Sequence, residues 1–242
     1  MISRVVRFPD PTTLAHSVAK RLLDQIVELQ QRGSVNLCLT GGRTANLVYE
    51  RLAELAPDSD LAPSKLRLWW GDERFVPTTD PLRNSMQALS RLARTIPLDP
   101  ANIHMMAARD GRKDSDESAE EYAEELQDVV FDITLLGLGE DGHTGSIFPD
   151  HPSFAATNRK VIGVVDAPKE PPERITLTIG QLNRSEQVWF ITTGKAKANA
   201  MARLLQYDPN LPPSYIHGQL ATYYFIDEDA AAELPASFSC EL

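Results

Sequence analysis

A glycine-rich segment in the second half of the chain carries the residue types best suited to acid–base chemistry. Residues 132–146 read DITLLGLGEDGHTGS, in which an apolar run ends in four glycines spaced around Asp141 and His143. The apolar part lacks the alternation of a half-buried strand and is typical of a strand buried on both faces of a parallel sheet. Ligands bind beyond the carboxyl ends of such strands, so we expect Asp141 and His143 at a binding site.

These two side chains have the chemistry of a general base and its partner. Histidine gains and loses a proton near neutral pH, and a positioned base contributes about 10²- to 10⁴-fold in rate. We interpret His143 as the base and Asp141 as the carboxylate that holds its tautomer. Two alternatives stay open: His143 only caps a turn, or the pair binds a metal with His151. Only two imidazoles and no cysteine are available there, so we predict no metal site.

A second polar loop has the sequence GDERFVP over residues 71–77 and directly follows two tryptophans. Its two carboxylates and its guanidinium lie beside a predicted buried strand and therefore need partners. The functional interpretation is that Asp72 orients a base or a substrate hydroxyl, while Arg74 stabilises negative charge in the transition state. The structural interpretation is an ion-pair network that closes the end of the sheet.

A third loop is suited to binding an anion. Residues 40–44 read TGGRT and open a predicted helix. Adjacent glycines let backbone N–H groups approach an anion at the helix N-terminus, which carries roughly half a positive charge. We predict a phosphate site formed by Gly41, Gly42, Arg43 and Thr44, with a simple tight turn as the alternative. The loop lacks the glycine spacing of a dinucleotide site and the lysine of a Walker loop, so neither NAD nor ATP is predicted.

Two further cations stand where an anionic group of a ligand could bind. Arg174 precedes a predicted strand within the sequence PPER, and Lys195 opens a helix within the sequence TGK. We take both as candidates for phosphate binding, with Arg83 left as an open candidate. The alternative is that they are solvated surface charges, as most lysines and arginines are.

The elements that must position these loops alternate along the chain between strand and helix patterns. Strands are predicted over residues 5–8, 35–39, 66–70, 133–139, 161–165, 175–178, 188–192 and 223–226, and helices over 14–29, 45–55, 84–92, 114–128 and 196–205. This alternation predicts an α/β fold with a doubly wound, largely parallel sheet and helices on both faces, similar to a Rossmann fold. We interpret residues 1–242 as one domain.

The composition limits the possible partners and locations. The chain of 242 residues carries 24 Lys and Arg against 34 Asp and Glu, a net charge of −10. This charge argues against nucleic acid or an anionic membrane as a partner, but not against a small anionic substrate in a locally positive pocket. Cys38 and Cys240 make neither a disulfide framework nor a metal site. There is no signal segment or membrane-spanning run, so we expect a cytoplasmic protein.

In these loops and along nearly its whole length, the chain resembles the 6-phosphogluconolactonase family, whose members are relatives of the glucosamine-6-phosphate isomerases. The motifs that carry the resemblance occur in the family's order: TGGRT at 40–44, WGDERFVP at 70–77, NS at 84–85, GLGEDGHTGSIFP at 137–149, PERITLT at 172–178 and GK at 194–195. The resemblance implies hydrolysis of 6-phospho-D-glucono-1,5-lactone to 6-phosphogluconate in the oxidative pentose phosphate pathway. It also implies the family's α/β fold and no metal or organic cofactor.

The resemblance also implies roles for individual residues. By position, His143 would activate water, Asp141 would orient His143, and Arg74 would face the charge at the lactone carbonyl. The loop from Gly41 to Thr44, together with Arg174 and Lys195, would hold the phosphate. The partner would be a small phosphosugar lactone, bound by a monomer or a homodimer.

The sequence departs from the usual family pattern at four positions. Ala45 stands where a proline is common, Gly145 where an alanine is usual, and Asp150 in place of a glycine, while Arg43 adds a charge. Asp150 alters the electrostatics at the rim of the site. None of these changes removes a group that the mechanism needs.

Two other functions are compatible with the same architecture. In an aldose–ketose isomerase or deaminase, Asp72 would abstract a proton beside a carbonyl and His143 would open the sugar ring. Those isomerases resemble one another in an Asn-Glu-Pro after the histidine loop, whereas Phe148 stands here in place of the glutamate. A sugar-phosphate-sensing regulator would carry a basic helix-turn-helix segment, and no residues are left for one.

Overall fold

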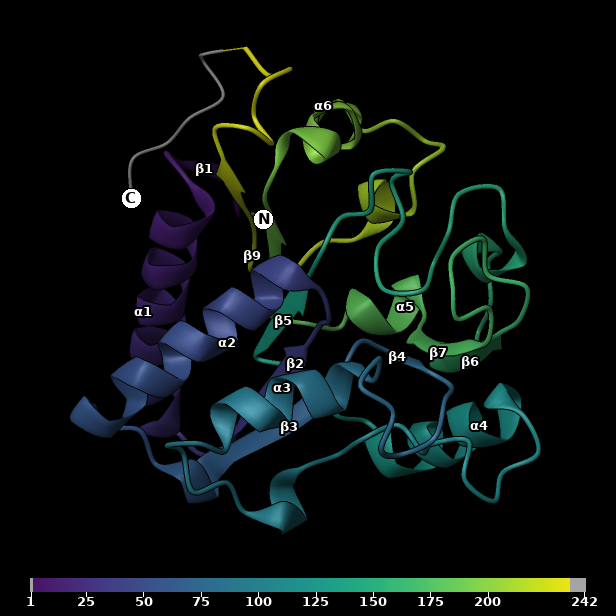
Figure 1. The fold of residues 1–242 in the computed structure, drawn as a ribbon, viewed down its shortest axis with the longest axis horizontal. Coiled ribbons are helices and arrows are strands. Elements are labelled where there is room, and N and C mark those ends of the chain that lie inside the picture. The colour runs from purple at the N-terminus through teal and green to yellow at the C-terminus, as the bar shows by residue number, and fades with distance from the viewer. Residues whose placement is uncertain (1, 236–242) are drawn as a thin grey trace.

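Six strands form one parallel sheet in the computed structural model, which describes residues 2–235 (Figure 1). In spatial order the strands are β1 (Ile2–Phe8), β9 (Ala221–Asp227), β8 (Gln187–Thr192), β5 (Ile133–Leu136), β2 (Val35–Leu39) and β3 (Leu66–Trp70). Every neighbouring pair is parallel. The helices that connect and cover them are α1 (Pro11–Gln30), α2 (Arg43–Leu55), α3 (Asn84–Leu92), α4 (Ser115–Leu126), α5 (Ile179–Leu182) and α6 (Ala198–Leu205). The predicted fold class is confirmed.

The central strands are buried on both faces, which explains their unbroken apolar runs. In β2, Leu37 and Leu39 pack into the apolar cluster that contains α1 and α2, whereas Cys38 packs into the cluster on the opposite face. Figure 1 shows α1 and α2 side by side along one face and α6 on the other. The sheet is therefore the middle layer of three.

Three shorter strands form a second, antiparallel sheet in the order β4 (Asp72–Arg74), β7 (Arg174–Leu177) and β6 (Val161–Val164). The sequence pattern did not separate β6 and β7 from the main sheet, and it placed residues 72–74 in a loop. The structure corrects both expectations. Residues 165–173 contain no helix and are too few for the crossover that parallel neighbours need, so β6 and β7 pair as antiparallel strands.

Strand β1 lies at an edge of the main sheet, where it pairs with β9 from the other end of the chain. The assignment of residues 1–242 to one domain stays a prediction.

Cys38 is buried as a free thiol, and Cys240 lies outside the described residues. Among residues 2–235, none of the helices has the length and apolar composition required for crossing a bilayer.

Candidate active site

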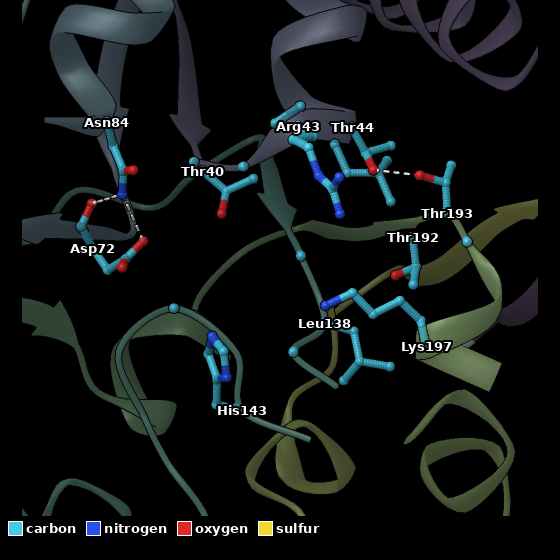
Figure 2. Close-up of a pocket in the computed structure, with 18 of the residues that line it drawn as sticks. Thr40, Arg43, Thr44, Asp72, Asn84, Leu138, His143, Thr192, Thr193 and Lys197 are labelled. Atoms are coloured by element: carbon cyan, nitrogen blue, oxygen red, sulfur yellow. Dashed lines mark hydrogen bonds between the residues drawn. The ribbon is translucent and has the colours of Figure 1, made fainter. Parts of the chain in front are cut away.

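The loops that follow β2, β3, β5 and β8 meet at one edge of the main sheet and line a cavity of about 570 Å³ (Figure 2). They meet there because the carboxyl ends of parallel strands lie on the same edge. Most of the site residues predicted from the sequence line this cavity, namely Gly41, Gly42, Arg43, Thr44, Asp72, Arg74, His143 and Arg174. Residues that lie more than a hundred positions apart in the chain are thus brought together.

His143 lines the cavity and forms a hydrogen-bonded pair with Asp141. Nδ1 of His143 lies 2.6 Å from Oδ1 of Asp141, which leaves Nε2 as the nitrogen available to a ligand. Asp141 itself is not among the residues that line the cavity. Burial raises the pKa of Asp141, but the hydrogen bonds and charges of His143 and Lys169 outweigh that effect and hold this pKa well below its usual value. The carboxylate is therefore ionised and accepts the Nδ1 proton.

Gly139 makes room for this pair. A Cβ atom at Gly139 would lie 2.0 Å from Nδ1 of His143 and 2.4 Å from Oδ1 of Asp141. The backbone N–H of Gly139 also donates to the carbonyl oxygen of His143, at 2.7 Å, and so closes the loop. Position 139 therefore requires glycine, because no larger side chain has room there.

The register of the second sheet determines which charged side chains of β4 face the cavity. Asp72 pairs with Thr176 and Arg74 pairs with Arg174, so these four residues share one face of the sheet. Glu73 points to the other side, where its carboxylate accepts the backbone N–H groups of Asn84 and Ser85 at the start of α3. Burial raises the pKa of Glu73, although Arg83 and these amides oppose the effect.

Asp72 is a buried carboxylate that is held at both oxygens. Its Oδ1 accepts a hydrogen bond from Nδ2 of Asn84 at 3.1 Å, and its Oδ2 accepts one from Oγ of Ser146 at 2.8 Å. The two donors come from α3 and from the His143 loop. Asp72 therefore links these two elements while it faces the cavity.

The two arginines of the second sheet make different contacts. Arg74 donates from Nη1 to the carbonyl oxygen of Leu82, while its buried Nε has no hydrogen-bond partner among the described residues. Arg174 donates to the carbonyl oxygens of residues 169–171 and lies over the ring of Phe148, 5.5 Å from its centroid. Phe148 in turn packs against His143, with ring centroids 4.6 Å apart. Arg174 thus lies near the His143 end of the site.

The opposite end of the cavity is suited to an anion. Helix α2 begins at Arg43 and has no side-chain cap, since its N-cap is Gly42, whose φ of 107° favours glycine. Its first N–H groups therefore face the cavity without a capping side chain. Thr44 is held by a hydrogen bond of 2.7 Å between its Oγ1 and that of Thr193.

Lys197 adds a cation to this end of the cavity and was missed by the sequence analysis. Its side chain lines the cavity, whereas the predicted Lys195 is exposed and is not among the lining residues. Burial lowers the pKa of Lys197; Glu140 opposes this shift, and the nearby cations Lys169 and Arg43 add to it. Residues 195–197 form a single 3₁₀ turn, in which side chains two positions apart point in different directions.

Arg83 is not part of the cavity lining. It is buried beside Glu73, with 3.6 Å between the closest charged atoms, and it donates to the carbonyl oxygen of Met106. Within residues 2–235, no group of three or more His, Cys, Asp or Glu side chains is arranged to hold a metal ion. His151 is engaged elsewhere, since its ring lies within hydrogen-bond distance of Ser153 and of the carbonyl oxygen of Val165.

The fold and the site define a class of α/β proteins that present a His–Asp pair and a cationic helix N-terminus across one cavity. A family model described as glucosamine-6-phosphate isomerases/6-phosphogluconolactonase matches residues 9–224. The chain belongs to this family.

Individual relatives agree with the family assignment. The chain is 41% identical to a 6-phosphogluconolactonase of Streptomyces coelicolor, covering 94% of this chain and 93% of that protein. It is 36% identical to the 6-phosphogluconolactonase of Mycobacterium tuberculosis, covering 98% and 100%. A solved structure of 6-phosphogluconolactonase from Thermotoga maritima matches with a TM-score of 0.83 and 26% identity, covering 93% and 99%.

Proposed function

We propose that this protein hydrolyses 6-phospho-D-glucono-1,5-lactone to 6-phospho-D-gluconate in the oxidative pentose phosphate pathway. The observation that carries the proposal is the His143–Asp141 pair, 2.6 Å apart, at one end of a cavity whose other end is the cationic start of α2. Its relatives of 36–41% identity are named for this activity. A lactone phosphate has its carbonyl and its charged group at opposite ends, as this arrangement requires.

In the proposed mechanism, His143 acts as a general base. Its Nε2 takes a proton from a water molecule, whose oxygen attacks the lactone carbonyl carbon and gives a tetrahedral oxyanion. The ring C–O bond then breaks, and the imidazolium returns the proton to the ring oxygen. That oxygen becomes an alcohol group of the product, while the oxygen of the water stays in the new carboxyl group. Asp141 stabilises the imidazolium between these two steps.

The oxyanion and the phosphate are bound at different ends of the cavity. Arg74 supports the developing negative charge at the carbonyl, since its buried Nε has no hydrogen-bond partner within residues 2–235. We assign the phosphate to the loop from Gly41 to Thr44, which includes Arg43, and to Lys197 in place of Lys195. Arg174 lies at the His143 end and holds residues 169–171, so we place it beside the reaction centre rather than at the phosphate.

Phe148 favours the lactonase over an isomerase or deaminase with the same fold. Its ring is fully buried and packs against His143, at the position where those isomerases carry a glutamate. A phenylalanine cannot move protons, so the second acid–base group of the isomerase reaction is missing from this position.

A comparison of two substrates tests the proposal directly. The purified protein is supplied with 6-phosphogluconolactone or with glucosamine 6-phosphate, and acid release and ammonia release are recorded beside protein-free controls for spontaneous hydrolysis. Enzyme-dependent acid release without ammonia is expected. Ammonia release with no acceleration of lactone opening would replace this proposal with the deaminase.

We further propose that the protein works in the cytoplasm, as a monomer or a homodimer, and binds no nucleic acid. The net charge of −10 supports the last point, because nucleic-acid phosphates would be repelled. Size-exclusion chromatography with light scattering tests the oligomeric state.

A further inference from the structure

Asn84 has a buried oxygen that the mechanism above does not use. Its side chain lines the cavity and the residue is only 1% exposed. The Nδ2 group donates to the backbone oxygen of Asp72 at 3.0 Å and to its carboxylate at 3.1 Å. Because both of these partners are acceptors, the amide cannot be turned the other way round. The Oδ1 atom consequently faces away from Asp72 and has no donor among the described residues.

The position of this oxygen explains a glycine in the neighbouring loop. A Cβ atom at Gly41 would lie 1.9 Å from Oδ1 of Asn84, so any side chain there would displace the amide. Gly41 does not have a positive φ, and hence its glycine is required by space rather than by backbone conformation. Figure 2 shows Asn84 and Asp72 together at the left of the cavity, with Arg43 and Thr44 across it and His143 below.

We infer that Oδ1 of Asn84 accepts a hydrogen bond from a ring hydroxyl of the sugar, on C2, C3 or C4, and so selects substrates that carry it. This inference rests on the proposed lactonase function. A buried carbonyl oxygen needs a donor. The phosphate and the lactone carbonyl offer acceptors, whereas a hydroxyl offers a proton. Asn84 is therefore a substrate-binding residue that distinguishes hydroxylated from deoxygenated sugars.

The experiment compares the parent lactone with its 2-deoxy, 3-deoxy and 4-deoxy analogues, all as 6-phosphates, in wild type and in Asn84→Ala. Wild type is expected to lose at least about tenfold in kcat/KM with one of the three analogues, because the loss of that hydroxyl leaves Oδ1 unpaired. Asn84→Ala is expected to lose about that much with the parent lactone and to discriminate less than about threefold against the same analogue.

Ser146→Ala is the matched control. It also removes one hydrogen bond to Asp72, but it leaves Oδ1 of Asn84 in place. Its kcat/KM is expected to fall by the same factor for all four lactones, so the discrimination stays at the wild-type level. A merely structural role of Asn84 would give Asn84→Ala this same uniform loss, which would overturn the inference.

The wild-type measurements alone keep the inference testable if Asn84→Ala does not fold. Equal kcat/KM for all four lactones in wild type would overturn it. Failure of the proposed function gives a different result, because wild type would then not accelerate hydrolysis of the parent lactone at all.

Discussion

Nζ of Lys169 donates to Oδ1 of Asp141 at 3.1 Å, and this is the same carboxylate oxygen that lies 2.6 Å from Nδ1 of His143. The lysine comes from the segment whose carbonyl groups are held by Arg174. A cation therefore competes with the imidazole for one acceptor. This arrangement limits how strongly Asp141 can stabilise a protonated His143.

Replacement of Lys169 by methionine is expected to move the acidic limb of the kcat/KM profile to higher pH. Removal of the positive charge leaves Oδ1 of Asp141 to His143 alone, so the carboxylate stabilises the imidazolium more strongly. Arg174 and Lys197 also interact with Asp141, while Asp72 interacts with Arg174 and Glu140 with Lys197; all four are unchanged in the variant. Lys169→Arg should restore the wild-type limb. An unmoved limb in Lys169→Met would show that the lysine has no such effect.

His143→Ala should reduce kcat for the lactone by at least about a hundredfold while KM changes little, because the base acts mainly in the transition state. The measurement is initial-rate kinetics with subtraction of spontaneous hydrolysis. His217→Ala is a suitable control, since His217 is exposed and, among residues 2–235, hydrogen bonds only through its backbone N–H. Turnover of His143→Ala near the wild-type level would exclude His143 as the base.

Lys197→Ala should raise KM by at least about tenfold and lower kcat much less, since a phosphate anchor binds the ground and transition states alike. Lys195→Ala, two positions away, is the matched control and should behave as wild type. The opposite result for the two lysines would return the phosphate site to the residue first predicted from the sequence.

The pH dependence of KM provides a second test of Lys197. Burial lowers its pKa, so the residue loses its charge at a lower pH than an ordinary lysine does. The charged form binds the phosphate, and KM should therefore rise as the pH increases into the alkaline range. In Lys197→Arg, whose guanidinium keeps its charge, this rise should disappear. A rise of the same size in both proteins would assign it to another group.

Gly139→Ala should reduce activity about as much as the loss of the base, at least about a hundredfold in kcat, because the added methyl group displaces His143 from Asp141. Gly180→Ala is the control, since a Cβ atom there would meet nothing closer than 3.9 Å. Circular dichroism and thermal unfolding establish that both variants fold. Full activity of Gly139→Ala would mean that the His143–Asp141 contact is dispensable.

The sequence predicted which loops line the cavity, because each loop follows an apolar run that identifies a buried strand. Gly41, Asp72 and His143 all lie within seven residues of such a run, and the carboxyl ends of parallel strands lie at one edge of the sheet. Sequence reasoning could therefore place these residues together without knowing the order of the strands. Asp72, Glu73 and Arg74 form a short strand, but three consecutive charged residues show no alternation of apolar and polar types, and we interpreted them as a loop.

The residues that sequence reasoning missed depend on geometry that no local pattern encodes. The choice between Lys195 and Lys197 depends on the phase of one 3₁₀ turn. Lys169 lies in a segment without periodicity and meets Asp141 across 28 positions of the chain. The unpaired oxygen of Asn84 follows from the orientation of its amide, which is determined by Asp72 on another element.

The position of β9 between β1 and β8 has a consequence for biosynthesis. During translation, the first strand emerges more than two hundred residues before the strand it hydrogen bonds with, and in the described sheet it has no other neighbour. In the nascent chain, β1 therefore lacks its hydrogen-bonding partner until residue 227 has left the ribosome. Pairing across such a sequence separation is slow, so this strand edge stays unpaired for most of the synthesis of the chain.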